Sequence, residues 1–297
     1  MGSGRSSSAG LDPRGLLLLL VTVFGWGLNW PAMKLLLAEI PVLSMRTACA
    51  ALGIALLFGI ALARRESLAV PRALWPRLVV VSFLNVSAWM GLAAFSLLWL
   101  AAGEATIVCY TMPVWASIFA WIILGEPPGL RRVLALVLGL GGLSVLVLGS
   151  GVEVGVAKLP GVAVALAAAV LFSLGTVVTK RWPLALPPNA GAAWQLGLGC
   201  APLLLGALLF EAPDFTALSP QAWALMAYAG IGPLGLCYLA WFAALRRLPA
   251  AAASAGTLLT PVVGVAAAAV FLGEALGVRE VLALSLTVSG VVLAVRG

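Results

Sequence analysis

Long apolar stretches dominate this chain, and short groups of charged residues, prolines and glycines separate them. A helix that crosses the apolar core of a bilayer needs about 20 apolar residues. Ten stretches have that length, and we expect each to form a transmembrane helix: 15–38, 41–63, 78–98, 104–125, 131–149, 160–182, 190–210, 221–245, 250–272 and 279–295. The connections between them are too short for another domain, so the pattern predicts an all-α membrane protein.

Composition supports this prediction. Hydrophobic residues make up 63% of the 297 positions and charged residues 9%, whereas soluble proteins contain about 45–50% and about 25%. A soluble protein of this composition could not cover its surface with polar groups. The net charge of +7 comes from basic residues that are scattered along the chain. We therefore expect the partners to be the lipid bilayer and a small-molecule substrate, and we expect no nucleic acid.

The residue types on which most enzyme chemistry depends are rare here. The chain has no histidine, and each of its four cysteines stands alone within an apolar stretch. These counts exclude histidine-dependent nucleophiles and histidine zinc sites, and they give no pattern for disulfides or a metal cluster. No acidic residue lies in the interior of an expected helix. We therefore expect no catalytic residue, no metal, no cofactor and no enzymatic activity.

Charged residues in the connections alternate between the two sides of the membrane. If the N-terminus is cytoplasmic, the external segments contain only Lys158 and Arg279, and the cytoplasmic segments contain 13 basic residues: Arg5, Arg14, Arg64, Arg65, Arg72, Arg77, Arg131, Arg132, Lys180, Arg181, Arg246, Arg247 and Arg296. Cytoplasmic loops of membrane proteins carry an excess of Lys and Arg. We therefore expect both termini in the cytoplasm.

An internal repeat relates the two halves of the chain. When residues 101–149 are aligned with 249–297, 18 of the 49 positions are identical, and the matches include Pro113 with Pro261, Gly125-Glu126 with Gly273-Glu274, and Arg131 with Arg279. We divide the chain into a disordered cytoplasmic tail (1–14), a first five-helix repeat (15–149), an outer linker (150–159) and a second five-helix repeat (160–297).

Because five is an odd number, the second repeat must cross the membrane in the opposite direction to the first. Inverted repeats are typical of transporters, in which two halves move around a binding site near the middle of the bilayer. The sequence therefore predicts ten transmembrane helices, arranged as two inverted five-helix repeats around a central cavity. Ten helices can enclose a path alone, so we expect a monomer.

The chain resembles the ten-helix EamA family of the drug/metabolite transporter superfamily. The resemblance covers nearly the whole chain and rests on Trp26 to Lys34, on Arg46, and on Pro113…Leu124-Gly125-Glu126 with its copy Pro261…Leu272-Gly273-Glu274. It implies a multi-pass protein of the bacterial inner membrane that exports amino acids or other metabolites, in some members aromatic amino acids. The related four-helix multidrug exporters couple to protons through a membrane-embedded glutamate, and no glutamate occupies such a position here.

Polar and aromatic residues at helical spacing predict which helix faces line the cavity. We expect the substrate to contact eight of them: Trp26, Asn29, Asn85, Trp89, Tyr110, Gln195, Tyr238 and Trp241. Trp and Tyr together with amides suit a ligand that has an aromatic or apolar body and polar ends. Hydrogen bonding between helices is an alternative role for the amides.

Prolines and isolated charges have two possible roles each. Pro113 and Pro261 interrupt helical hydrogen bonding at matched positions, which suits bending points for gating or static kinks. Glu126 and Glu274 could cap helices locally, pair with Arg131 and Arg279, or latch a gate. Lys34 and Arg46 lie within expected helices, where each could extend to the outer interface or face an outer vestibule as a partly buried cation.

We expect export of small amphipathic metabolites, foremost aromatic or hydrophobic amino acids, by alternating access. The absence of histidine and of interior acids favours facilitated diffusion or exchange over proton-driven transport. Efflux of drugs or cationic compounds through the same cavity is one alternative. A lipid scramblase is an alternative from a different class.

Overall fold

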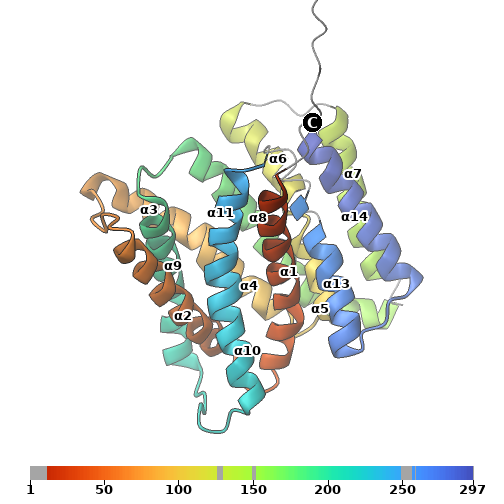
Figure 1. Cartoon of the computed structure of the whole chain (residues 1–297). Helices are drawn as coiled ribbons and strands as arrows, with labels where there is room; N and C mark the ends of the chain where they lie inside the picture. The colour runs from red at the N-terminus through yellow and green to blue at the C-terminus, as the bar shows by residue number, and fades with distance from the viewer. Residues whose placement is uncertain (1–11, 126–129, 149–151, 249–255, 258, 297) are drawn as a thin grey trace, which may run out of the picture.

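The computed structural model describes residues 12–125, 130–148, 152–248, 256–257 and 259–296. Within these ranges every regular element is helical (Figure 1). The elements are α1 (Pro13–Leu36), α2 (Val42–Ala63), the 3₁₀-helix η1 (Arg72–Leu74), α3 (Trp75–Ser82), the π-helix η2 (Phe83–Ala88), α4 (Trp89–Ser96), α5 (Ala102–Cys109), α6 (Met112–Leu124), α7 (Leu130–Leu148), α8 (Val152–Arg181), α9 (Pro188–Phe210), α10 (Pro220–Ile231), the π-helix η3 (Gly232–Leu236), α11 (Cys237–Leu245), α13 (Leu259–Leu272) and α14 (Val278–Arg296).

Seven helical segments of the described chain are long and apolar enough to cross a membrane: Pro13–Leu36, Val42–Ala63, Arg72–Ser96, Ala102–Leu124, Val156–Arg181, Pro188–Phe210 and Pro220–Trp241. Helices α7, α13 and α14 occupy the other three expected stretches, although residues 250–255 and 258 of the ninth lie outside the described part. The protein is therefore a multi-pass helical membrane protein. The count of ten spans stays a prediction.

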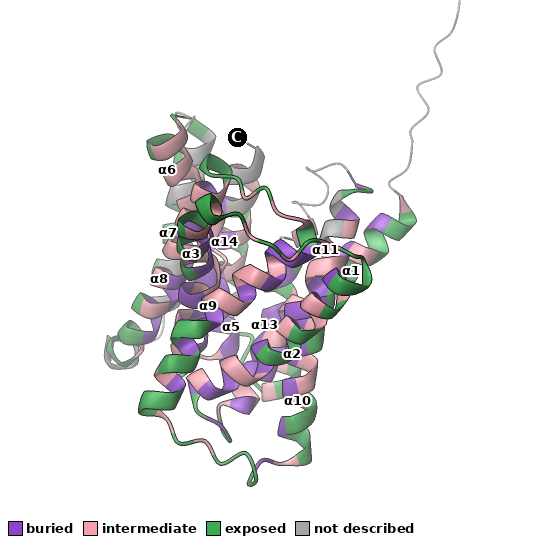
Figure 2. Cartoon of the chain, turned by 90° about the vertical axis from the view of Figure 1, so that its left-hand side faces the viewer, coloured by how far each residue is buried: buried purple, intermediate pink, exposed green. Residues whose placement is uncertain are grey.

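Many large apolar side chains are exposed, and Figure 2 shows exposed (green) residues along the outward faces of the helices. On α9, for example, Leu208 is 73% and Phe210 is 83% exposed. Such an apolar surface is unfavourable in water and is the surface expected in lipid. The buried side of the same helix contributes small residues, such as Ala193 and Ala207, which allow close helix packing.

The core lies where helices of the first half of the chain, up to Leu148, pack on helices of the second half, from Val152 onward. Helix α2 packs on α9, α7 on α14, α1 on α11 and α13, and α8 on α4 and α6. Helix α1 begins and α14 ends at the same end of the molecule (Figure 1). Helix α8 begins at Val152, so most of the segment expected to be an outer linker (150–159) is helical. The helices of each half of the chain therefore pack mainly on helices of the other half.

Four glutamates join the two halves by capping helix N-termini of the opposite half. A helix N-terminus carries unpaired N–H groups and partial positive charge, which a carboxylate satisfies. Glu39 accepts a hydrogen bond from the backbone N–H of Ser219 at 2.8 Å, and Glu66 accepts from Asn189 and Ala190 at 3.0 and 2.9 Å. In the same way, Glu211 accepts from the backbone N–H groups of Leu43 and Ser44 at 2.9 and 2.7 Å. Glu274 accepts from those of Ala102 and Gly103 at 2.6 and 2.9 Å.

The sequence left a local helix cap, a pair with Arg279 or a gate latch open for Glu274. In the structure its carboxylate instead accepts from backbone amides on α5, about half a chain away. Its repeat counterpart Glu126 lies outside the described residues. The preceding glycines, Gly125 and Gly273, both adopt left-handed backbone conformations (φ 72° and 67°) where α6 and α13 end. Glycine adopts this conformation without a steric penalty. The repeated glycine thus ends a helix in both halves.

Three stretches expected as continuous helices are interrupted. The stretch 104–125 is divided into α5 and α6 at Tyr110 and Thr111, and Pro113 lies in the first turn of α6. The π-helix η2 divides 78–98, and the π-helix η3, which contains Pro233, divides 221–245. Proline lacks the N–H that an α-helix would use at that position, which accounts for η3. All three interruptions lie beside one cavity.

Candidate substrate-binding site

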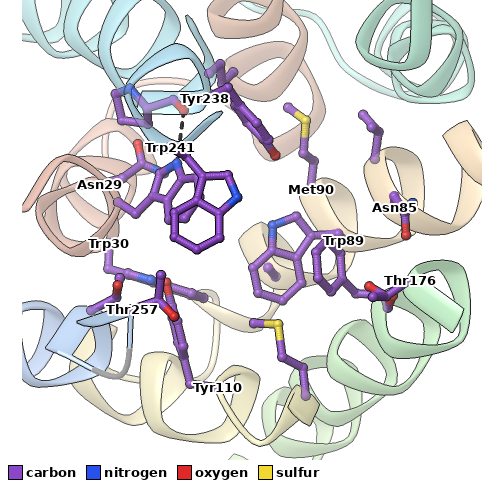
Figure 3. A pocket seen from close by; sticks show the side chains of 18 of the residues that line it. Asn29, Trp30, Asn85, Trp89, Met90, Tyr110, Thr176, Tyr238, Trp241 and Thr257 are labelled. Carbon is purple, nitrogen blue, oxygen red and sulfur yellow. Dashed lines mark hydrogen bonds between the residues drawn. The ribbon is translucent and has the colours of Figure 1, made fainter. Parts of the chain in front are cut away.

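A cavity of about 520 Å³ lies between the two halves and is lined by residues from helices of both. All eight residues predicted to contact substrate line it: Trp26, Asn29, Asn85, Trp89, Tyr110, Gln195, Tyr238 and Trp241. Figure 3 labels six of them, which converge from several helices on one space: Asn29, Asn85, Trp89, Tyr110, Tyr238 and Trp241. The volume is within the range of small-molecule sites, about 300–1,000 Å³. Their common location is a finding, and contact with a substrate stays a prediction.

Aromatic rings form two groups in the lining of this cavity. Trp26 of α1 contacts Tyr238 edge-on, with ring centroids 5.6 Å apart, and also Trp241 at 6.2 Å. Trp89 of α4 contacts Phe172 of α8 at 4.9 Å and Trp30 edge-on at 6.5 Å. Edge-to-face and tilted ring pairs of this kind are stabilising and rigid. The walls are thus preformed aromatic surfaces.

The two groups are built alike, because each combines rings from both halves of the chain. Trp89 follows the π-helix η2 directly, and Tyr238 lies two residues after the π-helix η3. Trp26 and Phe172, the partners of these rings, stand eight residues before Lys34 and Lys180. The indole N–H of Trp26 also donates to the carbonyl oxygen of Pro233 in η3 at 3.1 Å. Single π-turns occur often at functional sites, and here each one positions a cavity ring.

Two amide oxygens in the cavity lack hydrogen-bond partners. The Oδ1 atoms of Asn29 and Asn85 are buried and unpaired, and the Asn85 Nδ2 donates to Thr179 Oγ1 at 3.2 Å. Buried polar groups are usually hydrogen-bonded, and an unpaired one costs about 1–3 kcal/mol. Asn29 and Asn85 therefore offer acceptors to a bound molecule.

The sequence left two roles open for Arg46, and the structure places this residue in the cavity lining. Its side chain comes from the second turn of α2, is only 4% exposed, and donates from Nη1 to the sulfur of Met33 at 3.0 Å. Other lining residues that the sequence analysis did not select are Met90, Met112, Phe172, Thr179, Thr260 and Thr287. Phe172, apolar in an apolar helix, gave no signal by itself.

Lys34 does not line the cavity, and its extension to the outer interface stays a prediction. Its ammonium group donates to the carbonyl oxygens of Leu97 and Leu100 (2.9 Å to the latter), where α4 ends. A cation at a helix C-terminus is stabilised by the unpaired carbonyls and the helix dipole. The role of Lys34 in this structure is therefore a cap that joins α1 to α4.

Pro113 and Pro261 both line the cavity. Pro113 is in the first turn of α6, and Pro261 is the third described residue of α13. Proline in the first turn of a helix loses no hydrogen bond, so Pro113 does not kink α6. Residues 256–257 are helical as well, and residue 258 lies outside the described part of the chain, so no such statement applies to Pro261. A role in gating stays a prediction, with the break before α6 as the place where the backbone could bend.

Beyond the cavity, a group of charges lies at the N-terminus of α5. Glu104 is buried and accepts from the backbone N–H of Ala101, and its carboxylate pairs with Lys158 of α8 (2.7 Å) and Arg279 of α14 (3.3 Å). Lys158 and Arg279 are the two basic residues assigned to the external side. The group ties three helices together on that side of the cavity.

Comparisons with known proteins agree with this architecture. The uncharacterized transporter YvbV of Bacillus subtilis (strain 168) is 30% identical over 289 residues, which cover 94% of this chain and 91% of YvbV. An uncharacterized transporter of Archaeoglobus fulgidus is 25% identical over 94% of this chain and 98% of its own length. A crystal structure of a protein with 24% identity has the same fold, with a TM-score of 0.67 over 94% of this chain and 96% of that one.

The sequence pattern of the EamA-like transporter family matches this chain twice, over residues 13–148 and again over residues 159–296. Together the two matches take in all the helices that line the cavity. The protein is a membrane transporter by this relationship, and the chain belongs to the EamA-like transporter family.

Proposed function

We propose that this protein exports small amphipathic metabolites, with aromatic or hydrophobic amino acids as its substrates. The observation that carries the proposal is the cavity of about 520 Å³, whose walls are Trp, Tyr and Phe rings and whose few polar groups include two unpaired amide oxygens. An aromatic side chain would stack on the rings, while its polar end would find hydrogen-bond partners. A cationic drug would face Arg46 in this cavity, which disfavours efflux of cations.

Transport would proceed by alternating access between two inverted five-helix halves that together contain ten transmembrane helices. The double match of the family pattern supports this arrangement, as do the packing and capping contacts that run between the halves. The 13 to 2 distribution of basic residues supports cytoplasmic termini in a bacterial inner membrane. One chain encloses the cavity, which supports a monomer.

The proposed mechanism is facilitated diffusion or exchange. Among the described residues that line the cavity, none is Asp, Glu or His. Proton-coupled carriers use such groups to bind a proton within the transport path. Without them, the free energy of the substrate gradient is the driving force.

Counterflow in liposomes tests the proposal. Purified protein is reconstituted into vesicles loaded with unlabelled phenylalanine, and uptake of labelled phenylalanine is followed with and without a pH gradient; empty vesicles are the control. We expect exchange that does not require the gradient. Uptake that occurs only with an imposed gradient would refute the uncoupled mechanism. Absence of exchange for a panel of aromatic and aliphatic amino acids, together with lipid mixing between leaflets, would instead favour a scramblase.

A further inference from the structure

Arg46 is a buried cation without a carboxylate partner among the described residues. Its Nε atom is buried and has no hydrogen-bond partner, and the acceptor that contacts Nη1 is a thioether sulfur, Met33 Sδ. A guanidinium group carries five N–H donors, and a thioether is a weak acceptor. The hydrogen-bonding capacity of this side chain is therefore mostly unused within the protein.

The groups around Arg46 do not neutralise its charge. The titratable side chains that interact with it are the thiols of Cys49 and Cys200 and the phenol of Tyr238. Glu211, which α9 places against α2, is bonded to the amides of Leu43 and Ser44 at the helix N-terminus. A buried charge is costly unless it is paired, so this position is unfavourable for stability alone.

We propose that Arg46 binds the carboxylate group of the transported substrate, so that the substrate class is carboxylates with an aromatic or apolar body. The inference rests on the proposed transport function and specifies its substrate. A guanidinium can bind both oxygens of a carboxylate through two parallel N–H donors. Arg46 lines the same cavity as the aromatic rings, so one small molecule can contact both.

Amino acids and simple organic acids share the carboxylate, and they differ in the ammonium group. Asn29 and Asn85 line this cavity as well, and their unpaired Oδ1 atoms are buried acceptors that a rotation of the amide would turn toward an ammonium group. Three probes separate the possibilities: phenylalanine carries both groups, phenylalaninamide lacks the carboxylate, and 3-phenylpropionate lacks the ammonium group. Inhibition of counterflow by each probe gives its relative affinity.

For the wild type we expect phenylalanine to compete and phenylalaninamide to compete at least about 30-fold more weakly, since an unpaired partner of a buried charge pair has at least this effect. Arg46→Met should weaken carboxylate binding by a similar factor and remove the preference over the amide. Arg46→Lys, which keeps the charge and loses the bidentate geometry, should fall between the two. The melting temperature of Arg46→Met should equal or exceed that of the wild type, because an unpaired buried charge is removed.

Lys34→Gln is the matched control, because Lys34 is the other cation within an apolar helix and does not line the cavity. It should lower the melting temperature, since two carbonyl caps are lost, and leave the preference for phenylalanine over its amide unchanged. A wild-type protein that accepts the amide as well as phenylalanine would overturn the inference, and so would an Arg46→Met variant with the wild-type preference. If Arg46→Met does not fold, an unchanged preference in Arg46→Lys overturns it.

The outcomes also separate this inference from the proposed function. Transport of 3-phenylpropionate but not phenylalanine, with dependence on Arg46, would retain the carboxylate site and refute amino-acid export. Transport of phenylalanine that is insensitive to Arg46 would retain amino-acid export and refute the carboxylate site.

Discussion

Trp89 offers a direct test of whether the aromatic walls contact substrate. Its ring lies 4.9 Å from Phe172 and 6.5 Å from Trp30, so Trp89→Ala removes two ring contacts that connect α4 to α8 and α1. Each such contact is worth about 0.5–1.5 kcal/mol beyond its buried area. A substrate ring that stacks on Trp89 would lose a contact of the same size, which corresponds to a roughly 2- to 10-fold weaker apparent affinity.

The assay is phenylalanine counterflow in proteoliposomes, combined with thermal unfolding in detergent to establish that the variant is folded. Trp223→Ala is the matched control, because Trp223 is 51% exposed on α10, has Phe215 as a ring neighbour, and does not line the cavity. We expect a raised KM for Trp89→Ala and a wild-type KM for Trp223→Ala. Equal KM values in both folded variants would refute the assignment of Trp89 to the binding surface.

Two further predictions concern packing and the caps between the halves. Gly199→Ala would place a Cβ 2.3 Å from Val86 Cβ and should destabilise the folded protein by about 1–3 kcal/mol, measured by thermal unfolding. Gly197 lies two residues away on α9 with open space around it, so Gly197→Ala should be neutral or stabilising in the same assay. The backbone N–H and hydroxyl of Ser219 lower the pKa of Glu39 below its usual 4.5. The contribution of ionised Glu39 to the stability of the fold is therefore present above pH 4.5 and is lost as pH falls through the lowered pKa. The difference in melting temperature between wild type and Glu39→Gln should disappear over that range.

The hydrophobic pattern predicted most of the helices because lipid requires long, continuous apolar segments. Their ends were predictable where the chain carries a specific signal, as at Gly125 and Gly273. The π-helix η2 was not predictable, because Phe83–Ala88 contains neither Pro nor Gly, and its backbone geometry depends on packing against α8 and α9. Helix α8 extends into the expected linker because polar residues such as Lys158 find partners on other helices, which the hydropathy of one segment does not reveal.

The cavity residues were predictable to the extent that side-chain type indicated a function. Trp, Tyr, Asn and Gln are conspicuous in apolar helices, and helical spacing selected eight residues that line one cavity. Phe172 resembles an ordinary lipid-facing or core residue, and only the fold places it against Trp89. For Arg46 the sequence allowed extension to the interface or a buried position. Its burial depends on the neighbouring helices α1, α9 and α11, which no local pattern encodes.

The carboxylates explain why Arg46 is left for a substrate. Among the residues whose side chains the structure describes, which leaves out Glu126 and Glu153, all eight acids accept a hydrogen bond from a backbone N–H at a helix N-terminus or a turn: Asp12, Glu39, Glu66, Glu104, Glu211, Asp214, Glu274 and Glu280. Such bonds favour the ionised form and hold the acids at the ends of helices. The acids thus serve the scaffold, and the described cavity lining keeps one unpaired positive charge. A carrier built in this way is suited to an anionic group on its substrate and has no carboxylate there to carry a proton.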